Sequence, residues 1–250
     1  MRKKIYSFII LFLSVNFYSC FHKTKIQHEV KHYEVLSNAI DSSVIKEILP
    51  YGIRIQDSMN QQIAEVVEPL IKETPEGNLG NFVCDALYKK HKNYLTDVNQ
   101  QADFVLLNNG GLRTNIPSGN LVVGKIFELM PFDNELVIVS LDSVGMKELF
   151  EFIAKKGGLP VSQLKLIIEN NFSKDVFVGN EIFNSQKKYK VLTSDYLLNG
   201  GDNMLFFKHA IEKVYLKKLI RTALIEYCLD ETKKGNKISS KKDGRIQLSK

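Results

Sequence analysis

The stretch ADFVLLNNGGLR, residues 102–113, joins a compact apolar run of β character to a polar loop with two glycines. A second loop of the same kind, NGGD at residues 199–202, follows another apolar run. Glycine tolerates positive φ and lets backbone N–H groups approach a ligand closely, while Asn, Arg and Asp supply hydrogen-bonding and charged groups. The two loops are therefore interpreted as two halves of one small-molecule site, although each loop taken alone also fits an ordinary tight turn.

An aromatic residue lies near each loop, with Phe132 beyond the first loop and Tyr196 just before the second. Two such rings can stack on the faces of a planar group. A ligand that combines a planar group with hydroxyls or a phosphate would suit this set of side chains.

Hydrophobic spacing along the rest of the chain predicts helices and strands in an irregular order. Helices are expected from residue 57 to the first strand, at 78–88 with Asn78 as the N-cap, at 122–130, at 143–154 and, as the clearest amphipathic pattern, at 214–229. Strands are expected at 63–67, 102–107, 135–141, 164–169 and 189–193. Because the two kinds of element do not alternate regularly, we expect an α+β domain with mixed β-sheets flanked by helices.

Residues 51–250 are expected to form one domain, because about 200 residues can bury a core and no repeat or linker divides them. Residues 20–50 are expected to be a tether with an irregular lead-in. Cys84 and Cys228 both fall on apolar helical patterns, which are compatible with either a disulfide or two buried free thiols.

Residues 1–19 have the features of a lipoprotein signal peptide. A basic start is followed by an apolar segment from Ile5 to Val15, and Ser19 directly precedes Cys20. The alternative is a transmembrane anchor, but this segment is shorter than the about 20 residues of a spanning helix, and Asn16 interrupts it. We therefore expect export, lipidation of Cys20, and a lipid anchor in the cell envelope that leaves the protein facing the periplasm.

The charge pattern argues against a nucleic-acid ligand. The formal net charge is +6, and residues 2–4 carry three of these positive charges. The remaining lysines are scattered along the chain and are expected on solvated surfaces.

Four motifs together resemble the C-terminal domain of the secreted 5′-nucleotidase and UDP-sugar hydrolase family. They are GNLGNFVCDAL at 77–87, LNNGGLR at 107–113, MPFDN at 130–134 and LTSDYLLNGGD at 192–202. They occur in the family's order with similar gaps, and the resemblance covers about residues 55–210.

The resemblance implies a substrate-binding role for seven residues. Phe132 and Tyr196 would sandwich a nucleobase, and Asp202 would accept hydrogen bonds from ribose hydroxyls. Arg113 would hold phosphate or ribose oxygens. The resemblance further implies that Asn108 and Gly111 shape the first loop and that Asn134 is available to the edge of the base.

One departure from the family concerns the phosphate. Family members carry a phosphate-binding arginine shortly before the first motif, whereas this chain has KETPE at residues 72–76. Either Lys72 or Arg54 would have to replace it, and lysine lacks the planar fork that binds phosphate in a bidentate way. A nucleoside would otherwise fit better than a nucleotide.

A second departure concerns catalysis. Family enzymes hydrolyse phosphate esters with two metal ions held by an N-terminal metallophosphoesterase domain. None of the five histidines here belongs to an Asp-x-His or His-x-His pair, and His91, within a lysine run, is expected at the surface. We therefore expect no catalytic residue, no metal site and no other cofactor in this chain, and two divalent metal ions in a separate metallophosphoesterase subunit.

The resulting hypothesis is that this chain is a lipid-anchored, substrate-binding subunit of a split 5′-nucleotidase. Only the complex of this subunit with its partner would act as a hydrolase in nucleotide catabolism. Two alternatives stay open. One is a lipoprotein that binds nucleosides or nucleotides without catalysis, and the other is a structural domain whose pocket is vestigial.

Overall fold

The structure is a computed structural model that describes residues 42–249. The predicted signal peptide, Cys20 and the predicted tether up to residue 41 lie outside the described residues. The chain divides into two compact units at Ile48 and Leu49, and the second unit carries every strand that the structure describes. Among residues 42–249, no helix combines the length and the apolar character that crossing a membrane requires.

Six α-helices and eleven strands are assigned within residues 42–249. The helices are α2 (Ser42–Met59), α3 (Asn78–His91), α4 (Val123–Leu129), α5 (Ser143–Lys155), α6 (Asp195–Leu198) and α7 (Ile220–Lys233). The strands are β1 (Gln62–Val66), β2 (Phe104–Leu106), β3 (Gly119–Val122), β4 (Glu135–Leu141), β5 (Val161–Ser162), β6 (Leu164–Glu169), β7 (Phe172–Val178), β8 (Glu181–Ile182), β9 (Tyr189–Ser194), β10 (Ala210–Leu219) and β11 (Ile246–Leu248).

The strands form three sheets. The largest has the order β10-β4-β9-β2-β5, a second has the order β11-β6-β7-β8, and β1 pairs with β3. Most neighbouring strands are antiparallel, but β2 with β9 and β11 with β6 are parallel. The predicted α+β class with mixed sheets is therefore confirmed.

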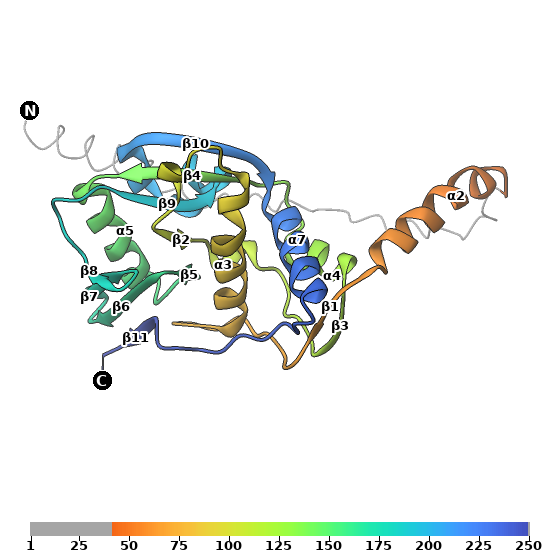
Figure 1. Ribbon diagram of the computed structural model, residues 1–250, viewed down its shortest axis with the longest axis horizontal. Helices are drawn as coiled ribbons and strands as arrows, with labels where there is room; N and C mark the ends of the chain where they lie inside the picture. Colours follow the sequence, from red (N-terminus) through yellow and green to blue (C-terminus); the bar gives the residue numbers. More distant parts are fainter. Residues whose placement is uncertain (1–41, 250) are drawn as a thin grey trace, which may run out of the picture. The chain divides into compact units, whose positions relative to one another are not determined.

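The five-stranded sheet separates two hydrophobic cores. Along β4, Leu136 and Ile138 belong to one core, whereas Val137, Val139 and Leu141 belong to the other. This alternation follows from the two-residue period of side chains along a strand. Figure 1 shows α3 and α7 on one side of this sheet, and α5 with β6, β7 and β8 on the other. Since both faces are covered, the sheet is the rigid frame from which the loops of the predicted site extend.

The predicted helix at residues 214–229 is wrong over its first part, because β10 extends to Leu219 and α7 begins at Ile220. In β10, Val214 pairs with Ile138, and Tyr215 pairs with Val137 on β4. Amphipathic spacing is a local signal. Where the residues are β-branched or aromatic, hydrogen bonding to the backbone of a strand that is distant in the chain can outweigh this signal.

The irregular lead-in predicted up to residue 50 is also wrong for its described part, since α2 begins at Ser42 and continues through Pro50. Val44, Ile48, Tyr51 and Ile55 recur every three or four residues, which is the helical signal that the prediction missed.

Asn78 does not cap α3 as predicted. The N-cap is Gly77, and Asn78 is the first helical residue. The Asn78 side chain instead binds the preceding segment, because its Oδ1 accepts from the Ile71 N–H at 2.6 Å and its Nδ2 donates to the Pro69 carbonyl at 3.0 Å.

His91 is buried, which overturns its predicted surface position. Its Nε2 accepts the Ala102 N–H at 3.1 Å, so its Nδ1 carries the proton and donates to the Tyr88 carbonyl at 2.6 Å. Burial lowers the pKa of His91 and favours this neutral form. The ring therefore ties the end of α3 to the segment that leads into β2.

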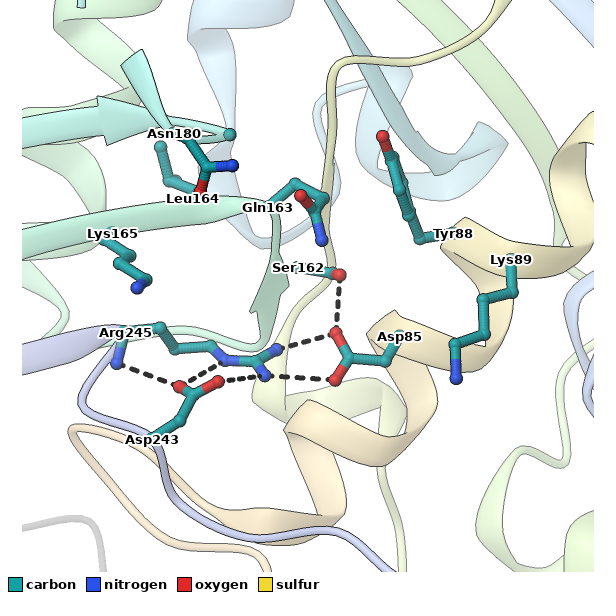
Figure 2. Close-up of a pocket in the computed structure, with 11 residues that line it drawn as sticks. Asp85, Tyr88, Lys89, Ser162, Gln163, Leu164, Lys165, Asn180, Asp243 and Arg245 are labelled. Carbon is teal, nitrogen blue, oxygen red and sulfur yellow. Dashed lines mark hydrogen bonds and ion pairs between the residues drawn. The ribbon is translucent and has the colours of Figure 1, made fainter. Parts of the chain in front are cut away.

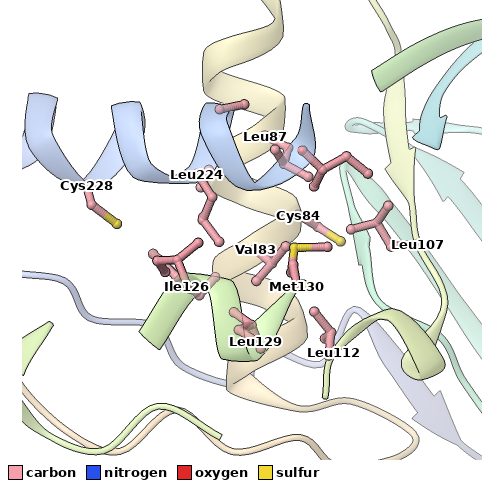
Figure 3. Packing of buried hydrophobic residues seen from close by; sticks show 14 of the residues in the cluster. Val83, Cys84, Leu87, Leu107, Leu112, Ile126, Leu129, Met130, Leu224 and Cys228 are labelled. Atoms are coloured by element: carbon pink, nitrogen blue, oxygen red, sulfur yellow. The ribbon is translucent and has the colours of Figure 1, made fainter. Parts of the chain in front are cut away.

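Cys84 and Cys228 are free thiols buried in the same core, where Figure 3 shows their packing. Burial raises the pKa of Cys84 well above its usual value, and the neighbouring charge of Asp85 adds to this. Burial and the charge of Glu231 raise the pKa of Cys228 to about 12. Both groups therefore remain protonated at neutral pH, and the thiol form is a poor nucleophile.

We expect Cys84 and Cys228 to resist a water-soluble disulfide reagent such as Ellman's reagent in the native chain, and to react when the chain is unfolded. The readout is peptide mass mapping after a timed reaction with and without denaturant. Rapid labelling of either residue in the native chain, or a Cys84–Cys228 disulfide found by mass, would contradict this expectation.

Candidate functional site

The first glycine loop directly follows β2. Asn109–Gly111 form a short 3-10 turn, and the Asn108 side chain lies against Gly110 and Gly111. A Cβ on Gly111 would lie 2.9 Å from Asn108 Oδ1, so glycine lets the Asn108 side chain take this position. Arg113 leaves the turn with its N–H bound to the Leu129 carbonyl at 2.9 Å and its Nη1 3.3 Å from the Gly110 carbonyl.

The second loop follows α6 and brings Tyr196 against Asp202. Gly200 has φ +89°, Asp202 has φ +52° and Asn203 has φ +65°, so three residues of this loop lie in the left-handed region. A Cβ on Gly201 would lie 2.4 Å from Tyr196 Cε1, and glycine therefore leaves room for the ring. The Tyr196 hydroxyl donates to Asp202 Oδ1 at 3.0 Å.

A hydrogen bond joins the two loops, which lie about ninety residues apart in the chain. Asn108 Nδ2 donates to Asp202 Oδ2 at 2.6 Å. Together with the Tyr196 hydroxyl, this bond uses one acceptor position on each carboxylate oxygen of Asp202. A carboxylate has about four acceptor positions, so Asp202 keeps capacity for a ligand's hydroxyls.

Phe132 lies on the loop between α4 and β4, and Arg221 on α7 holds that loop. Arg221 Nη1 donates to the carbonyls of Pro131 and Phe132, each at 3.2 Å, and Nη2 pairs with Asp133. The guanidinium also lies over the Phe127 ring, 4.5 Å from its centroid. These contacts fix the backbone that presents Phe132.

Asp195 connects the loop of Phe132 to the helix of Tyr196. Its Oδ1 accepts the N–H of Glu135 at 3.1 Å and the N–H of Tyr196 at 2.8 Å. One carboxylate therefore holds the beginning of β4, which follows the loop of Phe132, and the beginning of α6, which contains Tyr196. The sequence analysis assigned no role to Asp195, although Asp195 lies within the motif at 192–202. The sequence offered no signal for Arg221, because Arg221 is distant in the chain from the loop that it contacts.

All seven residues predicted to bind substrate line one cavity of about 240 Å³, together with Gly110. The predicted set is Asn108, Gly111, Arg113, Phe132, Asn134, Tyr196 and Asp202. The Phe132 and Tyr196 side chains remain 54% and 45% exposed, so two aromatic rings face an open cavity instead of packing into the core. Exposed rings beside convergent polar groups are typical of ligand sites.

Lys72 does not line this cavity. Its ammonium donates to the Leu112 carbonyl at 2.9 Å, and its N–H donates to Asn115 Oδ1 at 2.9 Å. Arg54 lies on the exposed face of α2. In the part of the chain that the structure describes, Arg113 is the cation among the residues lining the cavity.

The described histidines take no part in a metal cluster. His209 Nε2 lies 3.4 Å from Glu148 Oε2, and His91 is buried as described above. Within residues 42–249, no group of three or more His, Cys, Asp or Glu side chains is arranged to hold a metal ion. The other three histidines lie outside the described residues.

The chain is similar to known nucleotidases. It is 28% identical over 194 residues to the trifunctional nucleotide phosphoesterase protein YfkN of Bacillus subtilis, covering 70% of this chain and 12% of that protein. It is 24% identical over 175 residues to a 5′-nucleotidase of Vibrio parahaemolyticus, covering 65% of this chain and 29% of that protein. The chain thus spans less than a third of the length of these relatives.

Solved structures show the same fold. A 5′-nucleotidase precursor from Thermus thermophilus superposes with a TM-score of 0.67 at 26% identity, covering 82% of this chain and 43% of that one. The NAD nucleotidase of Haemophilus influenzae superposes with a TM-score of 0.63 at 16% identity, covering 85% of this chain and 42% of that one.

The family model described as 5′-nucleotidase, C-terminal domain, matches residues 62–209, a span that begins with β1 and contains all eight of the residues that line the cavity. Since this match covers more than half of the 250 residues, the chain belongs to the 5′-nucleotidase C-terminal domain family.

Proposed function

We propose that this chain is the substrate-binding subunit of a split 5′-nucleotidase in the cell envelope, serving nucleotide catabolism. The observation that carries the proposal is the convergence of two exposed aromatic rings, Asp202 and Arg113 on one open cavity. This combination matches the three parts of a nucleotide: a planar base, a ribose with hydroxyls, and an anionic phosphate.

Each part of the ligand has a chemical counterpart in the cavity. The base would stack on Phe132 and Tyr196, which tolerate different bases because every base has a π-face. The ribose hydroxyls would donate to the free acceptor positions of Asp202. Arg113 would bind phosphate or ribose oxygens, and the Asn134 amide would bind the edge of the base.

A second, metallophosphoesterase chain would supply the chemistry and the two divalent metal ions. The cavity supports this part of the proposal. Its volume of about 240 Å³ is smaller than the roughly 300–1,000 Å³ of complete small-molecule sites, and its rings are half exposed, so the phosphate end would project from the domain. This chain would position the substrate, and the phosphate would be attacked at the partner's metal ions.

The location belongs to the same proposal. Export by a lipoprotein signal peptide and acylation of Cys20 would anchor the subunit by lipid and expose it to the periplasm. The support for it is the sequence pattern of residues 1–20.

The proposal is tested by calorimetric titration of the chain with adenosine and AMP. We expect both to bind, with AMP no more than about tenfold tighter, because a single exposed ion pair contributes about 0–1 kcal/mol. Asp202→Asn is expected to weaken adenosine binding about five- to tenfold, equivalent to about 1 kcal/mol for hydrogen bonds that lose their charged acceptor. Asparagine also tolerates the φ of +52° at this position, so the fold should be preserved.

Asp175→Asn is the matched control, because Asp175 has a similar φ of +50° and lies outside the cavity. It should leave both affinities unchanged. The absence of saturable heat with either ligand on a correctly folded chain would contradict the proposal.

A non-catalytic nucleoside-binding lipoprotein is the second candidate. It is favoured by the presence of one cation in the cavity lining, which holds phosphate less firmly than a pair of arginines would. Gene neighbourhood distinguishes the two functions. A neighbouring gene that encodes the metal-binding motifs of a metallophosphoesterase favours the split enzyme, and the absence of such a gene favours the binding protein.

A further inference from the structure

A second cavity, of about 350 Å³, lies apart from the ring-lined one and shares no residue with it. Figure 2 shows it between α3, the corner where β5 passes into β6, and the C-terminal segment. Its lining is polar, with Leu164 as the aliphatic exception. The lining residues used below are Asp85, Ser162, Gln163, Lys165, Asn180 and Arg245.

The floor of this cavity is a closed ion-pair network around Arg245. Its Nη1 and Nη2 donate to the two carboxylate oxygens of Asp85 at 2.8 and 3.0 Å, and its Nε and Nη2 donate to Asp243 at 2.9 and 2.8 Å. The remaining N–H of Nη1 donates to the Val161 carbonyl at 2.9 Å. All five guanidinium N–H groups are therefore used and hold the floor rigid, although the single charge of Arg245 balances only one of these two carboxylates.

Ser162 connects this floor to the open space. The residue is 1% exposed, and its hydroxyl donates to Asp85 Oδ1 at 2.5 Å. With its proton committed, the Ser162 oxygen can only accept, and it lines the cavity. A ligand hydroxyl could donate to it.

The walls carry donors without a protein partner. The ammonium of Lys165 on β6, the amide of Gln163 before it and the amide of Asn180 on the β7–β8 turn make no hydrogen bond or ion pair within residues 42–249. Figure 2 shows these three side chains around the same space beside Arg245. Three unpaired donor groups from two segments, the start of β6 and the β7–β8 turn, thus converge on one cavity.

The charge of the cavity selects an anion. Lys89, Lys165 and Arg245 supply three positive charges, whereas Asp85 and Asp243 supply two negative ones, which leaves a net charge of one positive. Since Arg245 is fully occupied by the two carboxylates, the free charge is that of the lysines.

We propose that this cavity binds a small, hydroxylated phosphate ester. The phosphate binds the Lys165 ammonium and the amides of Gln163 and Asn180, and a hydroxyl of the ligand donates to Ser162. Ammonium and amide N–H groups are suitable donors to phosphate oxygens, and the polar lining leaves no place for a large apolar group.

The test is calorimetric titration of the purified chain with ribose 5-phosphate as the probe and ribose as its uncharged counterpart. We expect saturable binding of ribose 5-phosphate and none of ribose at the same concentrations. Lys165→Ala is expected to weaken binding about tenfold, because it removes a charge-assisted hydrogen bond. Lys188→Ala is the control, since Lys188 is exposed and lies outside the cavity.

A second variant guards against a folding defect. Gln163 has φ +58°, a backbone conformation that glycine adopts without strain, so Gln163→Gly removes the amide without disturbing the fold. It should also weaken ribose 5-phosphate binding. No saturable binding to the folded wild-type chain would overturn the proposal, and so would equal losses in the Lys165 and Lys188 variants. Binding that is lost in Asp202→Asn and kept in Lys165→Ala would assign the ligand to the ring-lined cavity and would likewise overturn it.

Discussion

Arg245→Met is expected to lower the free energy of unfolding by about 2–4 kcal/mol. Removing one partner of a buried ion pair typically costs about 3–5 kcal/mol because the other charge is left unpaired. The Arg245 side chain is 9% exposed, but those of Asp85 and Asp243 are 36% and 50% exposed, so water compensates part of that loss. Arg245 also connects α3 to the C-terminal segment and, through Val161, to β5, so no neighbouring side chain can replace its five hydrogen bonds.

The measurement is urea unfolding followed by circular dichroism, with Arg245→Lys and the triple variant Arg245→Met, Asp85→Asn, Asp243→Asn as comparisons. Lysine keeps the charge but loses the planar fork, so an intermediate loss is expected. The triple variant should recover part of the stability, because Asp85 and Asp243 no longer leave unpaired charges and only the nearby Glu76 carboxylate remains. A loss below about 1 kcal/mol for Arg245→Met would mean that the network behaves as an exposed ion pair.

Phe132→Ala is expected to weaken adenosine binding about 5- to 150-fold, because stacking on an aromatic ring contributes about 1–3 kcal/mol per base. The ring is 54% exposed in the unliganded chain, so its removal should change stability little. Calorimetric titration gives the affinity, and thermal unfolding gives the stability. Phe172→Ala is the control, since that ring is 63% exposed and lies outside the cavity.

Arg221 allows a sharper version of the same experiment. If its contacts with the loop of Phe132 serve to present the ring, Arg221→Met should weaken adenosine binding in the wild-type background and have no further effect in Phe132→Ala. An equal loss in both backgrounds would mean that Arg221 acts on binding by another route. An unchanged affinity in Phe132→Ala would refute stacking at this position.

Local features of the sequence predicted much of the fold and, except for Gly110, the lining of the candidate site. The strands at 135–141 and 164–169 were predicted with the bounds that the structure has, because each is a short, mostly apolar run with polar residues on both sides. The glycine pairs marked the two loops, where Gly111 lies against the Asn108 side chain and Gly201 lies so close to the Tyr196 ring that a Cβ has no room. Four motifs in a fixed order then identified the family.

The boundary between β10 and α7, the burial of His91 and the roles of Arg221 and Arg245 could not be predicted in this way. Each depends on a partner that is distant in the chain or lies on another element, such as the β4 backbone or the Asp85 carboxylate. By itself, the sequence determined the two loops, the family and seven of the residues that line the candidate site. Only the tertiary structure decided that these side chains share one cavity and what holds them there, because hydrogen bonds and ion pairs between distant segments form only when the whole chain has folded.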